Sequence, residues 1–194
     1  MAQDTTPNLL DCLPDGPIAQ KQPTEPFYAV WQLLESVTDP EIPVVNLREM
    51  GILRAVRQTA TGLEVVITPT YSGCPATSQM HDDVVNALAK AGMAARVLTQ
   101  IAPAWSTDWM TPQGREKLRA YGIAPPHASR CGESNANVIQ FASKNRAASA
   151  NLAVVCPQCG STNTSETSHF GSTACKALYR CLDCLEPFDY FKPY

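Results

Sequence analysis

The sequence predicts an α+β fold, in which a small mixed sheet is packed with helices and is followed by a C-terminal cysteine-rich module. Three observations carry this prediction. Segments of helical and strand periodicity alternate through the first two thirds of the chain, a stretch rich in Ala, Ser and Asn follows, and two Cys-x-x-Cys pairs lie near the end. A chain of 194 residues is long enough for one domain of about 100 residues and a smaller stabilised module.

Composition divides the chain into four parts. Residues 1–24 carry four prolines without periodicity and are predicted to form a disordered-like tail. Residues 25–123 show the patterns of an α+β domain. Residues 124–152 have few large apolar side chains and are predicted to be a linker, and residues 153–194 hold the paired cysteines and form the second domain.

The first elements of the α+β domain are a helix and a hairpin. Phe27, Val30, Trp31 and Leu34 recur at helical spacing, and the two prolines of the DPEIP segment end that helix. Residues 52–57 and 63–68 are alternating or β-branched runs separated by QTATG. They are predicted to pair as a β-hairpin.

The same domain continues with helix, strand and helix. A helix is predicted from Pro75 to Lys90, with Met80, Val84, Leu88 and Ala91 on one face and Gly92 ending it. Residues 94–101 follow as a third strand. A last helix is expected to be capped by Thr111, to start at Pro112 and to stop near Gly122. Helices packed on a small mixed sheet are the natural arrangement of these elements.

Charge and hydropathy exclude several classes of protein. The net charge is −3, and no basic stripe of a nucleic-acid-binding protein is present. Residues 153–194 hold three basic and four acidic side chains, which disfavours nucleic-acid binding by the second domain. The N-terminus lacks the pattern of a secretory signal, and no run is long enough to span a bilayer, so a cytoplasmic protein without a membrane anchor is expected.

The two Cys-x-x-Cys pairs predict a zinc ribbon. Cys156 and Cys159 form the first pair, Cys181 and Cys184 form the second, and 21 residues (160–180) separate them. Each pair can form a knuckle, and a hairpin between the knuckles closes a tetrahedral four-thiolate site. Zinc is the expected ion, and iron is a second possibility because it has the same ligand chemistry. The alternative to a metal site is a pair of redox-active dithiols. Because four thiolates leave no open position, the site is expected to be structural.

Two further residues of the ribbon stand out. Gly160 follows the first knuckle and suits its tight turn, whereas Leu185 follows the second knuckle in place of a glycine. Cys175 is a fifth sulfur between the pairs. It is either a small buried apolar residue or an accessory thiol with a role in transfer or docking.

Cys74 is the chemically suggestive residue of the first domain. It lies between the hairpin and the helix predicted from Pro75, at the position of the N-cap. Exposed amides and the helix dipole at that position stabilise a thiolate, so a lowered thiol pKa is expected. Such a thiolate suits a metal ligand or a persulfide acceptor, and the alternative is a cysteine that only caps the helix.

Other polar and aromatic residues have two interpretations each. Asp39 and Glu41 of the DPEIP turn either lie near Cys74, as ligands or as groups that tune it electrostatically, or only shape the turn. Trp105 and Trp109 are either core residues or part of a docking patch. His81 is predicted to lie on a solvated helix face.

Two stretches of sequence carry a family resemblance. SVTDPEIPVVNLREMGIL followed by TPTYSGCPAT resembles the metal–sulfur cluster assembly domain family, which includes the SufT-like proteins. That match covers roughly residues 27–101. With AWSTDWMTPQGREKLRAYGIAPP and the C-terminal cysteine pairs, the chain is similar to the family of D subunits of phenylacetyl-CoA 1,2-epoxidase systems of aerobic phenylacetate degradation.

The resemblance implies an accessory role in that system. It implies a maturation factor that assists insertion of an iron–sulfur cluster or iron into the reductase or the di-iron oxygenase, without catalysis of its own. The hypothesis is that Cys74, with Asp39 and Glu41 nearby, transiently holds iron, a cluster or persulfide sulfur, while the ribbon and the tryptophans dock the recipient. The epoxidase subunits are then the partners, and a homodimer is compatible with the sequence.

Two rival functions remain open from the sequence. The protein could be a structural subunit or assembly scaffold of the same complex, with Cys74 inert. It could also be an enzyme with Cys74 as nucleophile, although His81 alone of the three histidines could approach that helix end. No catalytic residues are predicted.

Overall fold

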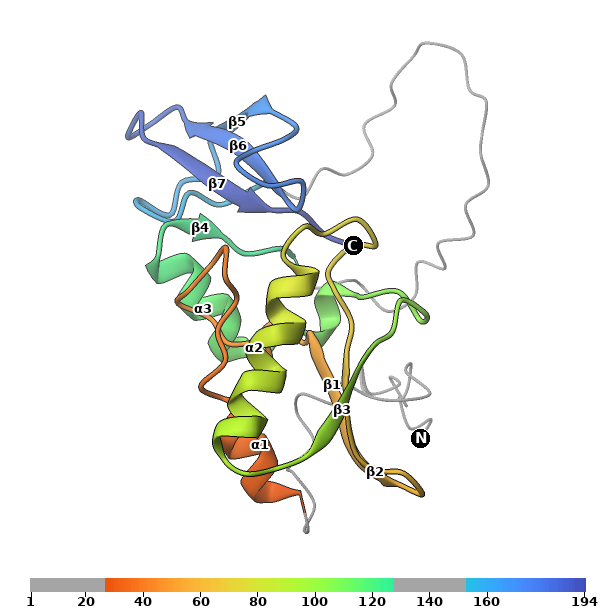
Figure 1. Cartoon of the computed structure of the whole chain (residues 1–194). Coiled ribbons are helices and arrows are strands. Elements are labelled where there is room, and N and C mark those ends of the chain that lie inside the picture. The colour runs from red at the N-terminus through yellow and green to blue at the C-terminus, as the bar shows by residue number, and fades with distance from the viewer. Residues whose placement is uncertain (1–26, 128–152) are drawn as a thin grey trace, which may run out of the picture.

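The computed structural model of the chain describes residues 27–127 and 153–194 (Figure 1). The predicted tail, 1–24, and most of the predicted linker, 128–152, lie outside the described residues. The predicted domain boundaries therefore stay a prediction.

The first sheet is mixed, as predicted. It consists of β1 (Leu53–Thr59), β2 (Gly62–Ile67) and β3 (Ala95–Thr99) in the order β1-β2-β3. β1 and β2 pair antiparallel as a hairpin, and β2 and β3 pair parallel. Parallel strands need a long crossover connection, and the helix between β2 and β3 supplies it. Val65, Val66 and Ile67 of β2 are buried because this strand is the central one.

Two helices cover the sheet. α1 (Tyr28–Leu34) buries Val30, Trp31 and Leu34, and α2 (Thr77–Lys90) packs against both α1 and β3 (Figure 1). The buried stripe of α2 is Met80, Val84 and Leu88, as its periodicity predicted, whereas Ala91 is the exposed C-cap residue.

The predicted start of α2 at Pro75 is wrong by two residues. The helix begins at Thr77, and Pro75 and Ala76 form a turn ahead of it. The N–H group of Thr77 donates to the carbonyl oxygen of Cys74 at 3.2 Å, which closes an i to i+3 turn and not a turn of α-helix. Cys74 therefore precedes the helix and does not occupy its N-cap.

The segment after β3 contains a short 3₁₀ helix, η3 (Thr107–Trp109), and α3 (Pro112–Ala120). The hydroxyl of Thr111 accepts a hydrogen bond from the N–H group of Gly114 at 3.0 Å, and Pro112 is the first helical residue. Both features were predicted. The last helix thus follows its sequence signals because capping and proline placement are local effects.

The second sheet has the order β4-β7-β6-β5. Its ribbon strands are β5 (Thr164–Ser168), β6 (Lys176–Cys181) and β7 (Pro187–Phe191), paired antiparallel. The fourth strand, β4 (Ile123–Ala124), follows α3 and pairs parallel with β7. The sequence does not predict β4, because two residues cannot show the period of a strand.

The ribbon and the first domain share one hydrophobic core. Cys175 and Phe191 of the ribbon belong to the same buried cluster as Trp105 and the core residues of the first domain. The rings of Trp105 and Phe191 lie 5.9 Å apart, and the C-terminus lies beside the loop that precedes α2 (Figure 1). The ribbon is therefore packed onto the first domain at the N-terminal end of α2.

The two tryptophans are core residues, and the proposed docking patch is wrong. Trp105 and Trp109 are 4% and 6% exposed. The indole N–H of Trp105 donates to the carbonyl oxygen of Met50 at 3.0 Å, and the guanidinium of Arg54 lies over the ring of Trp109. The hydrogen bond to a backbone carbonyl satisfies the one polar group of the buried Trp105 side chain.

None of the helices in residues 27–127 and 153–194 is long and apolar enough to cross a membrane.

Candidate metal and thiol sites

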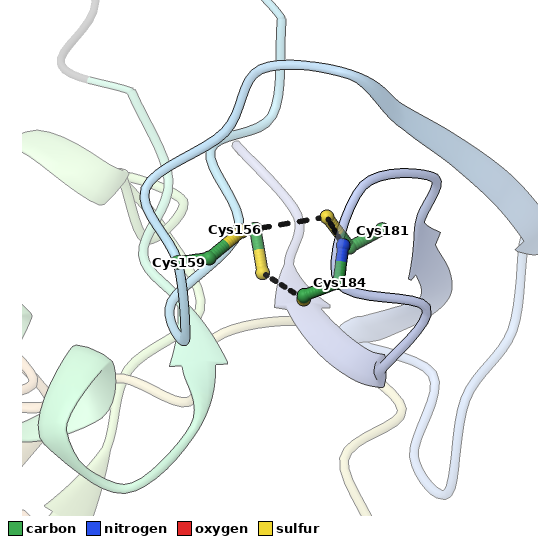
Figure 2. Close-up of side chains that lie close together, drawn as sticks. All are labelled: Cys156, Cys159, Cys181 and Cys184. Carbon is green, nitrogen blue, oxygen red and sulfur yellow. Dashed lines mark hydrogen bonds between the residues drawn. The ribbon is translucent and has the colours of Figure 1, made fainter.

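The four ribbon cysteines converge on one point. The sulfur atoms of Cys156, Cys159, Cys181 and Cys184 all lie within 4.8 Å of one another (Figure 2). Cys156 Sγ lies 3.7 Å from Cys184 Sγ, and Cys159 Sγ lies 3.6 Å from Cys181 Sγ. Metal–sulfur bonds of about 2.3 Å in a tetrahedron place the sulfur atoms roughly 3.8 Å apart. The cluster therefore has the dimensions of a four-thiolate metal site.

Local turns bring these thiols together. The N–H group of Gly160 donates to the carbonyl oxygen of Cys156 at 2.9 Å, with Gly160 at φ 75°. In the second knuckle, the N–H group of Cys184 donates to Cys181 Sγ at 3.5 Å. This bond, together with one from the backbone of Asp183 and those with the Cys184 and Cys159 thiols, lowers the pKa of the Cys181 thiol to about 7. Hydrogen bonds from amide N–H groups to sulfur stabilise the thiolate form that a metal ion requires.

The two knuckles are also joined by polar side chains. The carboxylate of Asp183 accepts hydrogen bonds from the Ser161 hydroxyl and, at 2.7 Å, from the Asn163 amide. These bonds lower the pKa of Asp183. Asp183 therefore fixes the second knuckle against the segment that follows the first.

Cys74 lies half-buried at the end of the loop before α2. Its thiol accepts a hydrogen bond from the N–H group of Ala76 and interacts with the hydroxyl of Thr77. Burial raises the pKa of Cys74, the carboxylates of Glu41 and Asp39 raise it further, and the two hydrogen bonds oppose this change. The predicted lowering of this pKa is therefore wrong, because burial and nearby negative charge outweigh the amide.

Asp39 shapes its turn, and its charge also acts on the Cys74 thiol. Its Oδ1 accepts hydrogen bonds from the N–H groups of Glu41 and Ile42, at 2.8 and 3.0 Å. The side chain is 8% exposed, and burial raises its pKa despite these two bonds. Burial, followed by the charge of Asp39, also raises the pKa of Glu41. The turn-shaping interpretation of Asp39 is thus correct, and both carboxylates act electrostatically on Cys74.

The charges of the same two carboxylates also act on Cys175. Cys175 is 5% exposed, and its sulfur lies 3.0 Å from the Thr173 hydroxyl. Burial raises its pKa, and Glu41 and Asp39 add to the effect while Lys176 opposes it. Cys175 is therefore buried, as the first of its two interpretations predicts, and a role in transfer or docking stays a prediction.

Three further groups that act on the thiols or on their carboxylates were not predicted from the sequence. Burial raises the pKa of Tyr71 to about 12, with contributions from Cys74 and Cys175. Tyr194 interacts with Cys175 from the C-terminus, and Lys176 interacts with both carboxylates. Tyr71 precedes Cys74 by three residues, which was the single available signal. The other two come from a distant part of the chain.

A small apolar cleft adjoins this group. It has a volume of about 300 Å³, and its lining includes Tyr71, Ile101, Trp105 and Tyr194. The hydroxyl of Tyr194 donates to the carbonyl oxygen of Ala174 at 3.3 Å. The cleft therefore joins the loop before α2 to the segment of the ribbon that carries Cys175.

His81 lies on a partly exposed face of α2. The groups that act most strongly on this thiol are the peptide of Ala76, Thr77 and the two carboxylates, and none of them is an imidazole. His81 is partly exposed, with its Nδ1 lying 3.2 Å from a carboxylate oxygen of Asp82. The predicted solvated position of His81 agrees with this geometry.

Two family models match the sequence. Residues 28–98 match a family described as iron-sulfur cluster assembly protein, and residues 140–192 match the PaaD zinc beta ribbon domain. These matches and the geometry above define the class: an iron–sulfur assembly domain joined to a four-cysteine zinc ribbon.

A relative over most of the chain defines the family. The chain is 45% identical over 166 residues to a protein of Escherichia coli (strain K12) that is provisionally named as the D subunit of 1,2-phenylacetyl-CoA epoxidase. The match covers 85% of this chain and 92% of that protein. The chain therefore belongs to the family of phenylacetyl-CoA epoxidase D subunits.

Two solved structures resemble part of the chain. A DUF59 domain from Bacillus anthracis is 26% identical, with a TM-score of 0.43, over 46% of this chain and 88% of that one. Rv1466 from Mycobacterium tuberculosis, a protein associated with [Fe-S] complex assembly and repair, is 30% identical, with a TM-score of 0.30, over 55% of this chain and 96% of that one. Superpositions this partial decide nothing about the function of the chain.

Proposed function

We propose that this chain is an accessory maturation factor of a multicomponent phenylacetyl-CoA 1,2-epoxidase in aerobic phenylacetate catabolism. It assists the insertion of iron or an iron–sulfur cluster into the reductase or the di-iron oxygenase and catalyses no step of the epoxidation itself. Family membership supports the epoxidase context, and the match of residues 28–98 supports the link to cluster assembly.

The observation that carries this proposal is the environment of Cys74. A half-buried thiol lies where two carboxylates act on it, within the part of the chain that matches the assembly family. Thiolate and carboxylate are both iron ligands. Burial raises the pKa of this thiol and of both carboxyl groups, and a cation that binds to them displaces the protons that they carry.

The two sites of the chain differ in a way that suits two roles. In the described part of the chain, the ribbon cysteines are the one set of three or more ligands already gathered as closely as an ion requires. A closed four-thiolate cage holds a resident ion. The looser group at Cys74 suits a cargo that must be released. We assign zinc to the ribbon and iron or a cluster to Cys74 as substrate, with iron in the ribbon as the chemical alternative.

The partners in this proposal are the di-iron oxygenase and the ferredoxin-type reductase. The proposed location is the cytoplasm, where thiols stay reduced and can serve as ligands. The E. coli relative is named as a subunit of the epoxidase, which supports direct contact with its other components. A homodimer remains compatible with this scheme.

A Cys74→Ser variant tests the proposal. The epoxidase components are co-produced with this variant, and iron per oxygenase, iron per reductase and epoxidase activity are measured. We expect several-fold lower iron in at least one recipient, with Ser78→Ala on the exposed face of α2 as the matched control. Full iron in both recipients would refute the carrier role.

The second candidate is a structural subunit or scaffold of the same complex. Its support is that Asp39 already has a structural role in its turn and that burial raises the pKa of Cys74, as in an inert thiol. In that case the Cys74→Ser chain co-purifies with the oxygenase at fixed stoichiometry and activity is unchanged.

A further inference from the structure

A cavity separate from the cleft at Tyr71 lies where α3 and β4 meet the ribbon. It has a volume of about 300 Å³. Helix α3 leads into β4, which pairs with β7 of the ribbon (Figure 1). The lining combines basic side chains with apolar walls and consists of Arg115, Arg119, Pro125, Pro126, His127 and Val155. None of these described lining residues is acidic, and a cavity with charges of one sign attracts an ion of the opposite sign.

Helix α3 presents both arginines of the cavity from one face. Arg115 and Arg119 are four residues apart within the helix, so they are neighbours on its surface. Two like charges at this spacing repel each other. An anion in the cavity relieves that repulsion, because it attracts both guanidinium groups.

The guanidinium of Arg115 is held in place by the protein itself. Its Nη2 donates to the carbonyl oxygen of Thr107 at 2.6 Å, and its Nη1 donates to the carbonyl oxygen of Pro126. A guanidinium has five N–H donors, and these two bonds use two of them. A donor group that is already oriented loses less conformational entropy when a ligand binds.

The imidazole of His127 carries an unsatisfied polar atom. Its Nε2 is buried and has no hydrogen-bond partner among the described residues. A buried polar atom without a partner is costly, and folded proteins usually provide one. Because His127 lines the cavity together with the two arginines, an oxygen of a ligand bound there can accept the missing hydrogen bond.

Two nearby carboxylates act on these arginines without lining the cavity. Glu116 accepts a hydrogen bond from Arg119 Nη1 at 3.1 Å, and both side chains of this pair are exposed. An exposed ion pair contributes little and is screened by salt. The charge of Asp108 acts on Arg115. The cavity therefore keeps its positive character.

We propose that this cavity binds the phosphate group of a phosphate monoester. A phosphate group carries a charge of about −1.5 to −2 at neutral pH and three terminal oxygens. Two arginines and one imidazole match that group better than they match a single carboxylate, and guanidinium forks fit its oxygens. The carbon part of the ester packs against the apolar walls, which are Pro125, Pro126 and Val155. The site is independent of the carrier role proposed for Cys74.

Calorimetric titration of the zinc-saturated full-length chain at low salt tests the inference. Phenyl phosphate and inorganic phosphate separate an ester from the free ion, and benzoate replaces the phosphate by a carboxylate on the same ring. The variants are Arg119→Gln, His127→Phe and Glu116→Gln. Arg96→Gln is the matched control, because it removes an equal charge from an exposed position of β3.

We expect wild type and Arg96→Gln to bind one phenyl phosphate per chain, more tightly than inorganic phosphate and about tenfold more tightly than benzoate. Arg119→Gln and His127→Phe should each weaken this affinity about tenfold, since each removes a hydrogen bond to a charged group. Glu116→Gln should strengthen it about twofold, because the competing carboxylate is gone.

A measurement on wild type needs no variant to fold. The ring nitrogens of the three histidines are followed by ¹⁵N NMR while phenyl phosphate is added. The resonances of His127 should shift with the same saturation curve as the heat of binding, and those of His81 and His169 should stay unchanged.

The outcomes that overturn the proposal are distinct. Benzoate bound as tightly as phenyl phosphate overturns the assignment to phosphate, and inorganic phosphate bound as tightly as phenyl phosphate overturns the assignment to an ester. Equal affinities of wild type and Arg119→Gln place the anion outside this cavity. Absence of both heat and a His127 shift at millimolar phenyl phosphate shows that the cavity binds no phosphate.

Discussion

At the scale of single residues, the second ribbon knuckle carries backbone strain. Leu185 has φ 67°, and it is the one non-glycine residue with positive φ in the described part of the chain. Gly160 has φ 75° at the equivalent turn after the first knuckle. A side chain in this conformation costs roughly 1–2 kcal/mol, and glycine does not bear that cost. The leucine side chain is 59% exposed and so recovers little from burial.

Leu185→Gly is therefore expected to stabilise the zinc-loaded protein by about 0.5–1 kcal/mol, after the extra chain entropy of glycine is subtracted. Urea unfolding of the zinc-saturated protein measures this change. Leu182→Gly is the matched control, because Leu182 is 50% exposed in the same knuckle and lacks a positive φ. It is expected to destabilise by about 0.5–1 kcal/mol. Destabilisation by both substitutions would contradict the strain argument.

Residue identity predicted the ribbon ligands but not the state of Cys74. Cysteine spacing alone locates four thiols at one ion, since the knuckle is a local structure. The pKa of Cys74 depends on burial and on carboxylates that lie more than thirty positions earlier in the sequence. Local sequence supplied the amide of Ala76 and suggested a lowered pKa, whereas the tertiary environment reverses the sign.

At the scale of elements, the start of α3 depends on a close approach of two backbones. The N–H group of Thr111 donates to the carbonyl oxygen of Glu49 at 2.9 Å. A β-carbon on Gly114 would lie 2.7 Å from that same oxygen. The glycine thus allows the first turn of α3 to pack on the segment before β1.

Gly114→Ala is expected to destabilise the protein by about 1–3 kcal/mol, although alanine is the better helix former by about 1 kcal/mol. The overpacking arises because backbone atoms of Glu49 cannot move aside as a flexible side chain would. Chemical denaturation of the variant gives the difference. Gln113→Ala, at the adjacent exposed position, should be neutral or slightly stabilising. A stabilised Gly114→Ala protein would show that this contact is not close in solution.

Helices and strands with clear periodicity were predicted, and those defined by partners were not. The buried stripe of α2 and the hairpin of β1 and β2 follow from apolar spacing. β4 has two residues and exists because β7 pairs with it. The predicted start of α2 is wrong by two residues because a non-helical turn and the first turn of an α-helix have the same sequence signals.

At the scale of the whole molecule, the ribbon is part of the core of its neighbour. Phe191 and Cys175 are buried with residues of the first domain, and Tyr194 lies edge-on to Trp105 at 6.3 Å. The sequence predicted two domains joined by a linker but contained no signal for this packing. The large aromatic side chains near the C-terminus are equally consistent with a small core inside the ribbon alone and with packing against the first domain.

Removal of the ribbon metal should therefore alter the first domain as well. A module this small has few buried residues of its own, so four thiols without an ion are expected to release β5, β6 and β7 from their packing. Phe191 and Tyr194 then leave Trp105, whose fluorescence should shift to longer wavelength as its surroundings become wetter.

A tight chelator in the absence of oxygen, with tryptophan emission and far-UV circular dichroism recorded together, measures this response. Zinc added back should restore both signals, and Trp105→Phe identifies the tryptophan that reports. An unchanged Trp105 signal in a fully zinc-free chain would mean that the shared core, and not the metal, holds the ribbon in place.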